Sequence, residues 1–140
     1  MAIWWIRRDM RLTDNLALQA ALDAGGAFVP VFVLDPFLLE KPAERRQAFL
    51  FAGLRSLQTD LRKLGSGLLI RCGDPVEEIP RLVEELGGVP VIAEEDASPY
   101  ARERDRAVGT RVNLSLLPGV GGHPLGSVLK ADGNPYTVFT

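Results

Sequence analysis

The chain of 140 residues has the length of one domain, and its 46% content of hydrophobic residues is sufficient for a buried core. A formal net charge of −2 argues against a free-standing nucleic-acid binder, although it leaves room for a basic patch on one face. No apolar stretch approaches the ~18 residues of a membrane span, so we expect a protein that does not enter a membrane. No signal sequence opens the chain and Cys72 is the only cysteine, so we expect a cytoplasmic protein.

Short apolar runs alternate with longer helical patterns, which predicts βαβ units and a parallel sheet. The expected strands are residues 3–6, 28–34, 68–71, 90–93 and 112–117. The expected helices run from a cap at Thr13 or Asp14 to about 24, from about 42 to 64 with a leucine stripe on one face, from Asp74-Pro75 to about 87, and from Ser98-Pro99 to 109. Right-handed crossovers then predict an α/β fold, a doubly wound, Rossmann-like sheet of order 3-2-1-4-5 with helices on both faces.

The pattern changes after Leu117, which divides the chain into a predicted α/β domain (1–117) and an extended tail (118–140). Residues 118–135 hold five of the 14 glycines and three of the 10 prolines, a composition typical of a linker. The tail also carries apolar residues, and we expect these to pack on the domain or to aggregate when the tail is free. Because the chain stops inside the apolar run 136–140, we expect it to be part of a longer protein.

Polar side chains collect where the expected strands end, the edge at which open α/β sheets bind their ligands. They are Arg7, Arg8, Asp9, Arg11, Asp35, Asp74, Glu95 and Asp96. One interpretation is a polar-rimmed pocket for a planar or nucleotide-like ligand. The other is a set of ion pairs and helix caps that closes the end of the sheet. The residues by themselves favour neither.

The signatures of catalysis and phosphate binding are missing from the expected places. The dinucleotide fingerprint G-x-G-x-x-G does not follow the first strand, and no phosphate loop G-x-x-x-x-G-K-[ST] occurs. The glycine-rich residues 119–123 lie after the last strand and are predicted to form a turn. His123 and Cys72 have no recognised metal-binding spacing, and Cys72 is predicted to be a small core residue. The residues therefore predict binding rather than bond-breaking chemistry.

Two further features are predicted to be structural. Trp4 and Trp5 point to opposite faces of a strand covered by helices, so both are expected in the core. The charged run 102–106 is expected to be a solvated helix face with ion pairs at three-residue spacing.

Five blocks of the sequence, in this order, are similar to blocks of the DNA photolyase/cryptochrome family. They are residues 5–15, 35–36, 73–75, 99–100 with 104–105, and 133–140. Over essentially its whole length the chain thus resembles the N-terminal α/β domain of that family. It departs from the family pattern at Ile6, Met10 and Leu16, and these departures bear on the identity of the antenna chromophore.

The resemblance implies a division of labour. In the family a linker connects this α/β domain to a larger helical domain, which holds the catalytic FAD and binds damaged DNA. The chain is therefore expected to be the N-terminal domain of a deoxyribodipyrimidine photolyase, a carbon–carbon lyase that repairs pyrimidine dimers with light. Its implied partner is the helical FAD-binding domain of the same parent chain, and damaged DNA is bound only through the full-length protein. By itself the domain is expected to be inactive and to hold no catalytic residue and no metal.

The resemblance also implies a light-harvesting antenna chromophore that passes excitation to the FAD. Members that use a deazaflavin or FMN bury it within this domain, whereas a folate lies in the cleft between domains. The pairing of Pro99-Tyr100 with Arg104-Asp105 favours a deazaflavin or FMN here and leaves a folate as the alternative. The residues implied to hold the chromophore are Met10, Asp35, Phe37, Leu38, Arg46 and Asp96.

Three other functions fit the same residues. A cryptochrome photoreceptor shares this domain, so repair and signalling are not separated by the sequence. A scaffold without a chromophore would only cover the helical domain. A more remote alternative is an independent nucleotide-binding module on a similar sheet, although its phosphate site after the first strand is missing.

Overall fold

A parallel sheet of five strands forms the centre of the molecule in a computed structural model that describes residues 1–24, 26–40, 43–119 and 126–134. The strands are β1 (Ala2–Ile6), β2 (Phe28–Leu34), β3 (Leu69–Cys72), β4 (Val91–Glu94) and β5 (Leu114–Leu117). Their order across the sheet is β3-β2-β1-β4-β5, which confirms the predicted topology. In the central strand, Trp5 is in register with Val31 on one side and Ala93 on the other.

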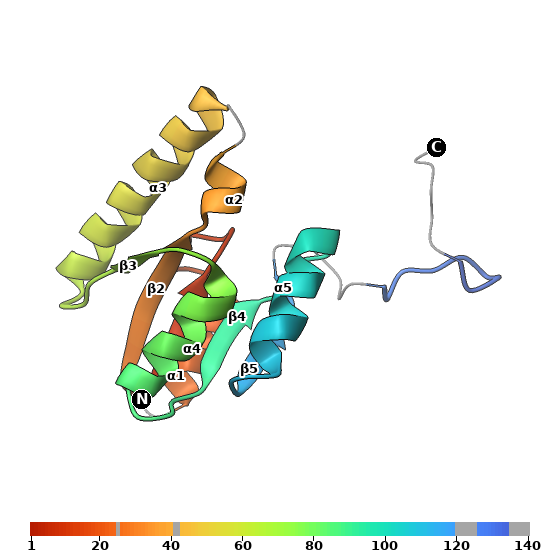
Figure 1. Ribbon diagram of the computed structural model, residues 1–140. Helices are drawn as coiled ribbons and strands as arrows, with labels where there is room; N and C mark the ends of the chain where they lie inside the picture. The colour runs from red at the N-terminus through yellow and green to blue at the C-terminus, as the bar shows by residue number, and fades with distance from the viewer. Residues whose placement is uncertain (25, 41–42, 120–125, 135–140) are drawn as a thin grey trace.

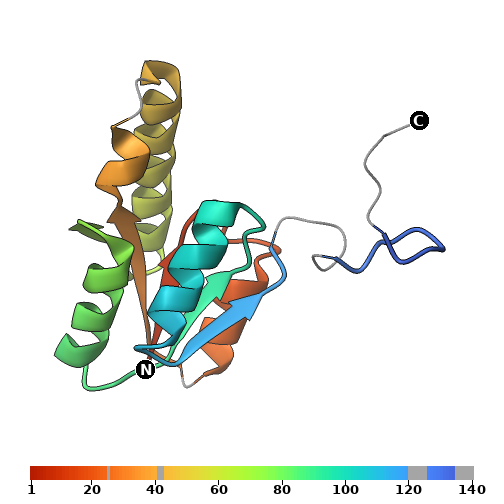
Figure 2. The same cartoon turned by 45° about the vertical axis from the view of Figure 1, so that its right-hand side comes forward.

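Helices cover both faces of this sheet (Figures 1 and 2). They are α1 (Leu16–Asp23), α2 (Pro36–Leu39), α3 (Glu44–Lys63), α4 (Pro75–Glu85) and α5 (Pro99–Gly109). Helices α1 and α3 pack on one face, and α4 and α5 lie side by side on the other. No helix in the described part of the chain is both long enough and apolar enough to cross a bilayer.

The core is divided by the sheet into two layers, with one tryptophan in each. Trp4 packs among Leu54, Leu57 and other residues of α1 and α3, while Trp5 packs among residues of α4 and α5. The side chains of successive strand residues point to opposite faces, and both faces of a doubly wound sheet are covered. Both tryptophans are at most 2% exposed, so their predicted place in the core is confirmed.

Two helices begin at the cap that the sequence predicts, and one does not. Asp74 caps α4 and Ser98 caps α5 through their side chains, as predicted. Helix α1, however, is capped by Asn15, whose Oδ1 accepts the backbone N–H of Leu18 at 2.8 Å. The predicted cap at Thr13 or Asp14 is therefore wrong: Asp14 has a left-handed backbone (φ 53°), which ends the preceding loop before the helix begins.

Two other local predictions need correction. Along α3 the leucine stripe is buried at Leu54, Leu57 and Leu61 but not at Leu64, which is 73% exposed because it lies just beyond the end of the helix. Cys72 is exposed rather than buried, because it ends β3 at the edge of the sheet.

In the predicted tail, Gly126 lines a hollow with Leu114 and Leu116 of β5. The residues after it, up to 134, form turns that run away from the sheet in both views (Figures 1 and 2). Val128 and Leu129 are about half exposed (54% and 46%), so the described part of the tail does not bury its apolar side chains on the domain. His123 and the apolar run 136–140 lie outside the described residues.

Candidate functional site

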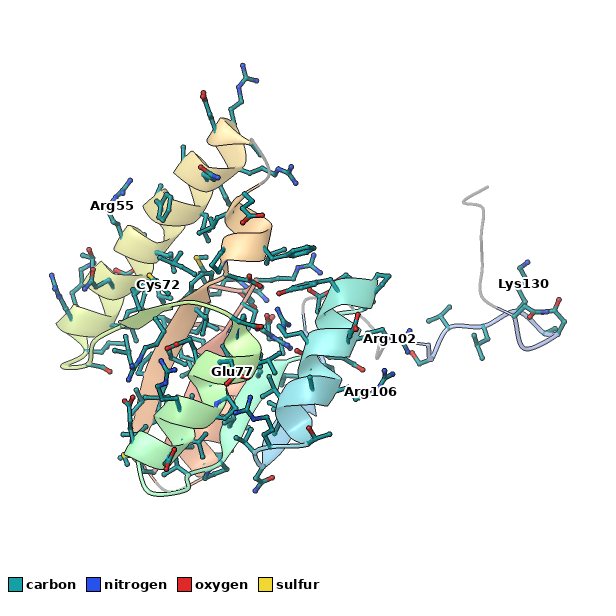
Figure 3. The ribbon with its side chains drawn as sticks, in the orientation of Figure 1. Arg55, Cys72, Glu77, Arg102, Arg106 and Lys130 are labelled. Atoms are coloured by element: carbon teal, nitrogen blue, oxygen red, sulfur yellow. The ribbon has the colours of Figure 1, made fainter. Side chains whose placement is uncertain are left out.

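The polar residues predicted after the strands, here called the rim, lie at one edge of the sheet. They do so because all five strands are parallel and their carboxyl ends meet there. Residues 7–11 leave β1, Asp35 leaves β2 and residues 95–96 leave β4. Since β1 lies between β2 and β4, the residues after β1 stand at the centre of this edge. Figure 3 shows many charged side chains gathered there, between α2 and α5.

At the centre of the edge, one carboxylate is shared by two buried arginines. Asp105 Oδ1 lies 2.5 Å from Arg7 Nη1 and 2.8 Å from Arg104 Nη2, and all three side chains are at most 8% exposed. Both guanidinium groups lie over the ring of Trp5, with their central carbons 5.0 and 4.9 Å from its centroid. The expected solvated face at 102–106 is thus wrong for Arg104 and Asp105, because residues of α5 that face β1 are covered by the sheet.

The cluster of Arg7, Arg104 and Asp105 carries an excess of positive charge. Nε and Nη2 of Arg7 are buried and have no hydrogen-bond partner among the described residues. Burial lowers the pKa of Arg7, although Asp105 acts in the opposite direction.

A second group of rim residues closes the loop after β1. Arg11 donates to Asp9 through Nε at 2.9 Å and Nη2 at 2.8 Å. The backbone N–H of Asp9 donates to Glu94 Oε2 at 3.1 Å, and burial raises the pKa of Glu94. Burial acts in the same direction on Asp9, but the hydrogen bonds from Arg11 outweigh it and leave the pKa of Asp9 below its usual value. Asp9, Arg11 and Glu94 thus bind one another, as expected if the polar residues at this edge close the end of the sheet.

A third group joins α2 to α5. Asp35 is buried; its Oδ1 accepts the backbone N–H of Phe37 at 2.9 Å, and its Oδ2 accepts the hydroxyl of Tyr100. The rings of Phe37 and Tyr100 are stacked with centroids 5.0 Å apart and planes inclined by 17°. Burial, and then the hydrogen bond to Asp35, hold the pKa of Tyr100 well above its usual value. Both oxygens of Asp35 are therefore already engaged.

The six residues implied to hold a chromophore do not line one cavity. Asp35 and Phe37 line the α2–α5 hollow, of about 420 Å³, together with Tyr100 and Arg104. Tyr100 and Arg104 were not among the expected site residues, although both belong to blocks that carry the family resemblance.

The remaining four residues lie elsewhere along the same edge. Leu38 and Arg46 line the α2–α3 hollow, of about 300 Å³, with Leu39, Ala43, Gln47 and Leu50. Met10 packs beside α3, where its Sδ is 2.9 Å from the position that a Cβ on Gly53 would take. Asp96 lies in the α5–β5 hollow, of about 540 Å³.

Asp96 is held by one contact that is local in the chain and one that is not. It accepts the backbone N–H of Ser98 at 2.9 Å and pairs with Arg8 at 3.4 Å. Burial acts to raise its pKa, but these contacts outweigh burial and lower it. Within the described residues, no group of three or more His, Cys, Asp or Glu side chains is arranged to hold a metal ion.

A family model described as DNA photolyase matches residues 2–140. The chain belongs to the DNA photolyase family. The deoxyribodipyrimidine photo-lyase of a Synechococcus strain is 35% identical over 98% of this chain and 30% of its own length. Cryptochrome-2 of Gallus gallus is 38% identical over 85% of this chain and 20% of its own length.

A solved photolyase structure supports the same assignment at the level of the fold. The archaeal photolyase from Sulfolobus tokodaii has a TM-score of 0.76 and 29% identity, over 84% of this chain and 29% of that chain. It is described as containing two FAD molecules, with the implication of a novel light-harvesting cofactor. The chain spans about half or less of the length of the curated relatives it matches, so in them this region is one domain of a longer protein.

Proposed function

We propose that the chain is the antenna domain of a deoxyribodipyrimidine photolyase and that it binds a deazaflavin or FMN beside the α2–α3 hollow. The observation that carries the proposal is that Leu38 of α2 and Arg46 of α3 line one hollow. Met10, from the loop after β1, packs against the same helix α3 at Gly53. The Sulfolobus relative, with its two FAD molecules, supports a flavin-like antenna in this family.

The residues present fit such a chromophore. Leu38, Leu39 and Leu50 offer apolar walls for a planar ring, and about 300 Å³ is at the lower end of the size of ligand pockets. Arg46 is exposed and makes no ion pair with any other residue that the structure describes, so its guanidinium is available for a ring oxygen, a ribityl hydroxyl or a phosphate. Gln47 uses its amide N–H to bind the Leu39 carbonyl at 2.8 Å, which leaves its side-chain oxygen as an acceptor.

The other implied residues take supporting roles in this proposal. Asp35 and Phe37 fix α2 against Tyr100, and α2 carries Leu38. Asp96 lines a different hollow and is bound by Arg8 and by the backbone N–H of Ser98, so we assign it to the closure of the loop after β4.

When bound, the antenna absorbs light and supplies excitation to the FAD of the helical domain in the full-length protein. The residues of this chain bind the chromophore, orient it and shield one of its faces. None is assigned to the repair reaction, so we expect no repair of pyrimidine dimers by these 140 residues alone.

The proposal is tested by titrating the chain with a deazaflavin, with FMN and with a reduced folate while recording absorption and fluorescence. We expect binding of a deazaflavin or FMN, and loss of about tenfold or more in affinity for Arg46→Ala, as for a hydrogen bond to a charged group. Arg55→Ala is the matched control, because Arg55 also lies on α3 and projects away from the sheet (Figure 3). If none of the three binds, or if both variants weaken binding equally, this antenna site is wrong.

A cryptochrome photoreceptor is the second candidate, and the identity to the Gallus gallus cryptochrome favours it specifically. Both candidates use the same antenna domain. They are separated by assaying a full-length protein that contains this chain for light-driven repair of pyrimidine dimers: repair identifies a photolyase, and its absence a photoreceptor.

A further inference from the structure

Two arginines without an ion pair to any described residue stand together on the outer side of α5. Arg102 and Arg106 are exposed, lie one helical turn apart and both line the α5–β5 hollow. Figure 3 shows them on the side of α5 that faces away from α4. Neither makes an ion pair with another described residue, so both guanidinium groups are free to bind a ligand.

Two of the three carboxylates that line this hollow are paired with arginines that do not line it. Asp105 is held by the buried Arg7 and Arg104, and Asp96 pairs with Arg8. Of the carboxylates that line the hollow, only Glu95 has no ion pair with a described residue. Counting these partners, five arginines stand against the three carboxylates of the hollow, so the site is cationic although the chain has a net charge of −2.

The rest of the lining is apolar and lacks bulk. Leu114 and Leu116 of β5 contribute hydrophobic surface, and Leu116 is 40% exposed. Gly109 ends α5 without a side chain, and no atom of the described residues lies within 4 Å of the position of an added Cβ. At about 540 Å³, the hollow has the size of a pocket for a small organic ligand.

We propose that the α5–β5 hollow binds a phosphate-bearing ligand of nucleotide size, with Arg102 and Arg106 on the phosphates and a planar group over Leu114 and Leu116. Residues four apart on a helix have Cβ atoms about 5–6 Å apart, so both arginines reach one diphosphate. A guanidinium can bind phosphate oxygens through two parallel hydrogen bonds, which suits this ligand class better than a single carboxylate. The site is separate from the antenna hollow, because the two hollows share no lining residue. The α5–β5 hollow lies beside β5, the outermost strand on that side of the sheet.

The probes for this site are ADP, inorganic pyrophosphate and adenosine, added to the 140-residue chain in calorimetric titrations at low salt. We expect ADP to bind more tightly than pyrophosphate, and adenosine to bind the most weakly. Arg102→Gln and Arg106→Gln are each expected to weaken ADP binding about tenfold or more, the size of a lost hydrogen bond to a charged group. The matched control is Arg55→Gln, which removes an exposed arginine from another helix.

The position of the ligand is read separately by NMR, from the amide signals of Gly109 and Leu116 during the pyrophosphate titration. Unchanged affinity in both α5 variants would overturn the proposal, as would an equal loss in Arg55→Gln, which would indicate general attraction of anions. Loss of pyrophosphate binding in Arg46→Ala, with no shift at Gly109, would place the anion in the antenna hollow instead. A failure of deazaflavin binding would leave this proposal intact, because neither ADP nor pyrophosphate reports on that chromophore.

Discussion

The hydroxyl of Tyr100 donates a hydrogen bond to Oδ2 of Asp35, 65 residues away in the chain. Tyr100 lies in the first turn of α5, and Asp35 caps α2. The bond therefore joins the residues that follow β4 to those that follow β2, on either side of the central strand β1. It fixes the position of α2, and hence of Leu38, relative to the rest of the carboxyl edge.

Replacing Tyr100 by phenylalanine removes this hydrogen bond and retains the ring that stacks on Phe37. We expect the free energy of unfolding to fall by about 1–3 kcal/mol, because the buried Oδ2 of Asp35 loses a donor. Urea unfolding followed by tryptophan fluorescence measures the change. A variant as stable as the native chain would show that the bond contributes nothing to folding.

Replacing Asp105 by asparagine leaves Arg7 and Arg104 buried without a counter-charge. Removing one partner from a buried ion pair costs about 3–5 kcal/mol, and a loss of stability of that size is expected here. Asp60→Asn provides the control, because Asp60 pairs with Lys63 on the surface and such pairs contribute about 0–1 kcal/mol. Equal effects of the two variants in urea unfolding would contradict a structural role for the buried cluster.

Burial raises the pKa of Glu94, so the carboxyl group of Glu94 binds its proton more tightly in the folded chain than in the unfolded chain. The corresponding stabilisation is present below the unfolded pKa and is lost as the pH rises through the folded pKa. Glu94→Gln has no charge to bury. Its stability relative to the native chain is therefore expected to increase from about pH 4, near the ordinary glutamate pKa, to about pH 7. Urea unfolding at both pH values measures the difference, and a constant difference would rule out burial of the charge as the cause.

Gly53→Ala tests the place of Met10 in the proposed antenna site. An added Cβ would lie 2.9 Å from Met10 Sδ, so the flexible end of the methionine must move. Because alanine favours a helix over glycine by about 1 kcal/mol, we expect stability to be retained or to rise. We expect deazaflavin affinity to fall, whereas Gly67→Ala, which has free space around its Cβ, leaves the affinity unchanged. Equal affinity in both variants would exclude Met10 from the site.

Much of the fold could be predicted because its signals are local. Asp74-Pro75 and Ser98-Pro99 set the starts of α4 and α5, and the alternation of Trp4 and Trp5 assigns one to each face of the sheet. The four-residue helix α2 was not predicted, since it is too short to show a period in the sequence. Its only signal was the pair Asp35-Pro36, a cap followed by a proline at the first helical position.

The candidate site could be predicted only as a set of loops. Parallel strands bring the residues after β1, β2 and β4 to one edge, and this follows from topology alone. Whether two side chains line the same hollow depends on how helices and strands that are distant in the chain pack together. Arg104 and Asp105 illustrate the difficulty: their sequence is that of a solvated helix face, and the sheet packed against them makes them a buried ion cluster.

The sequence by itself determined the order of the elements, the topology of the sheet and the family, because hydrophobic period, caps and motif blocks are properties of neighbouring residues. The tertiary structure alone decided that Met10, Leu38 and Arg46 lie apart from Asp96. It also decided that Arg102 and Arg106 line a hollow and pair with no carboxylate in the part of the chain that the structure describes. The reason is that the charge and space around a side chain are set by every element packed against it, and those elements are far away in the sequence.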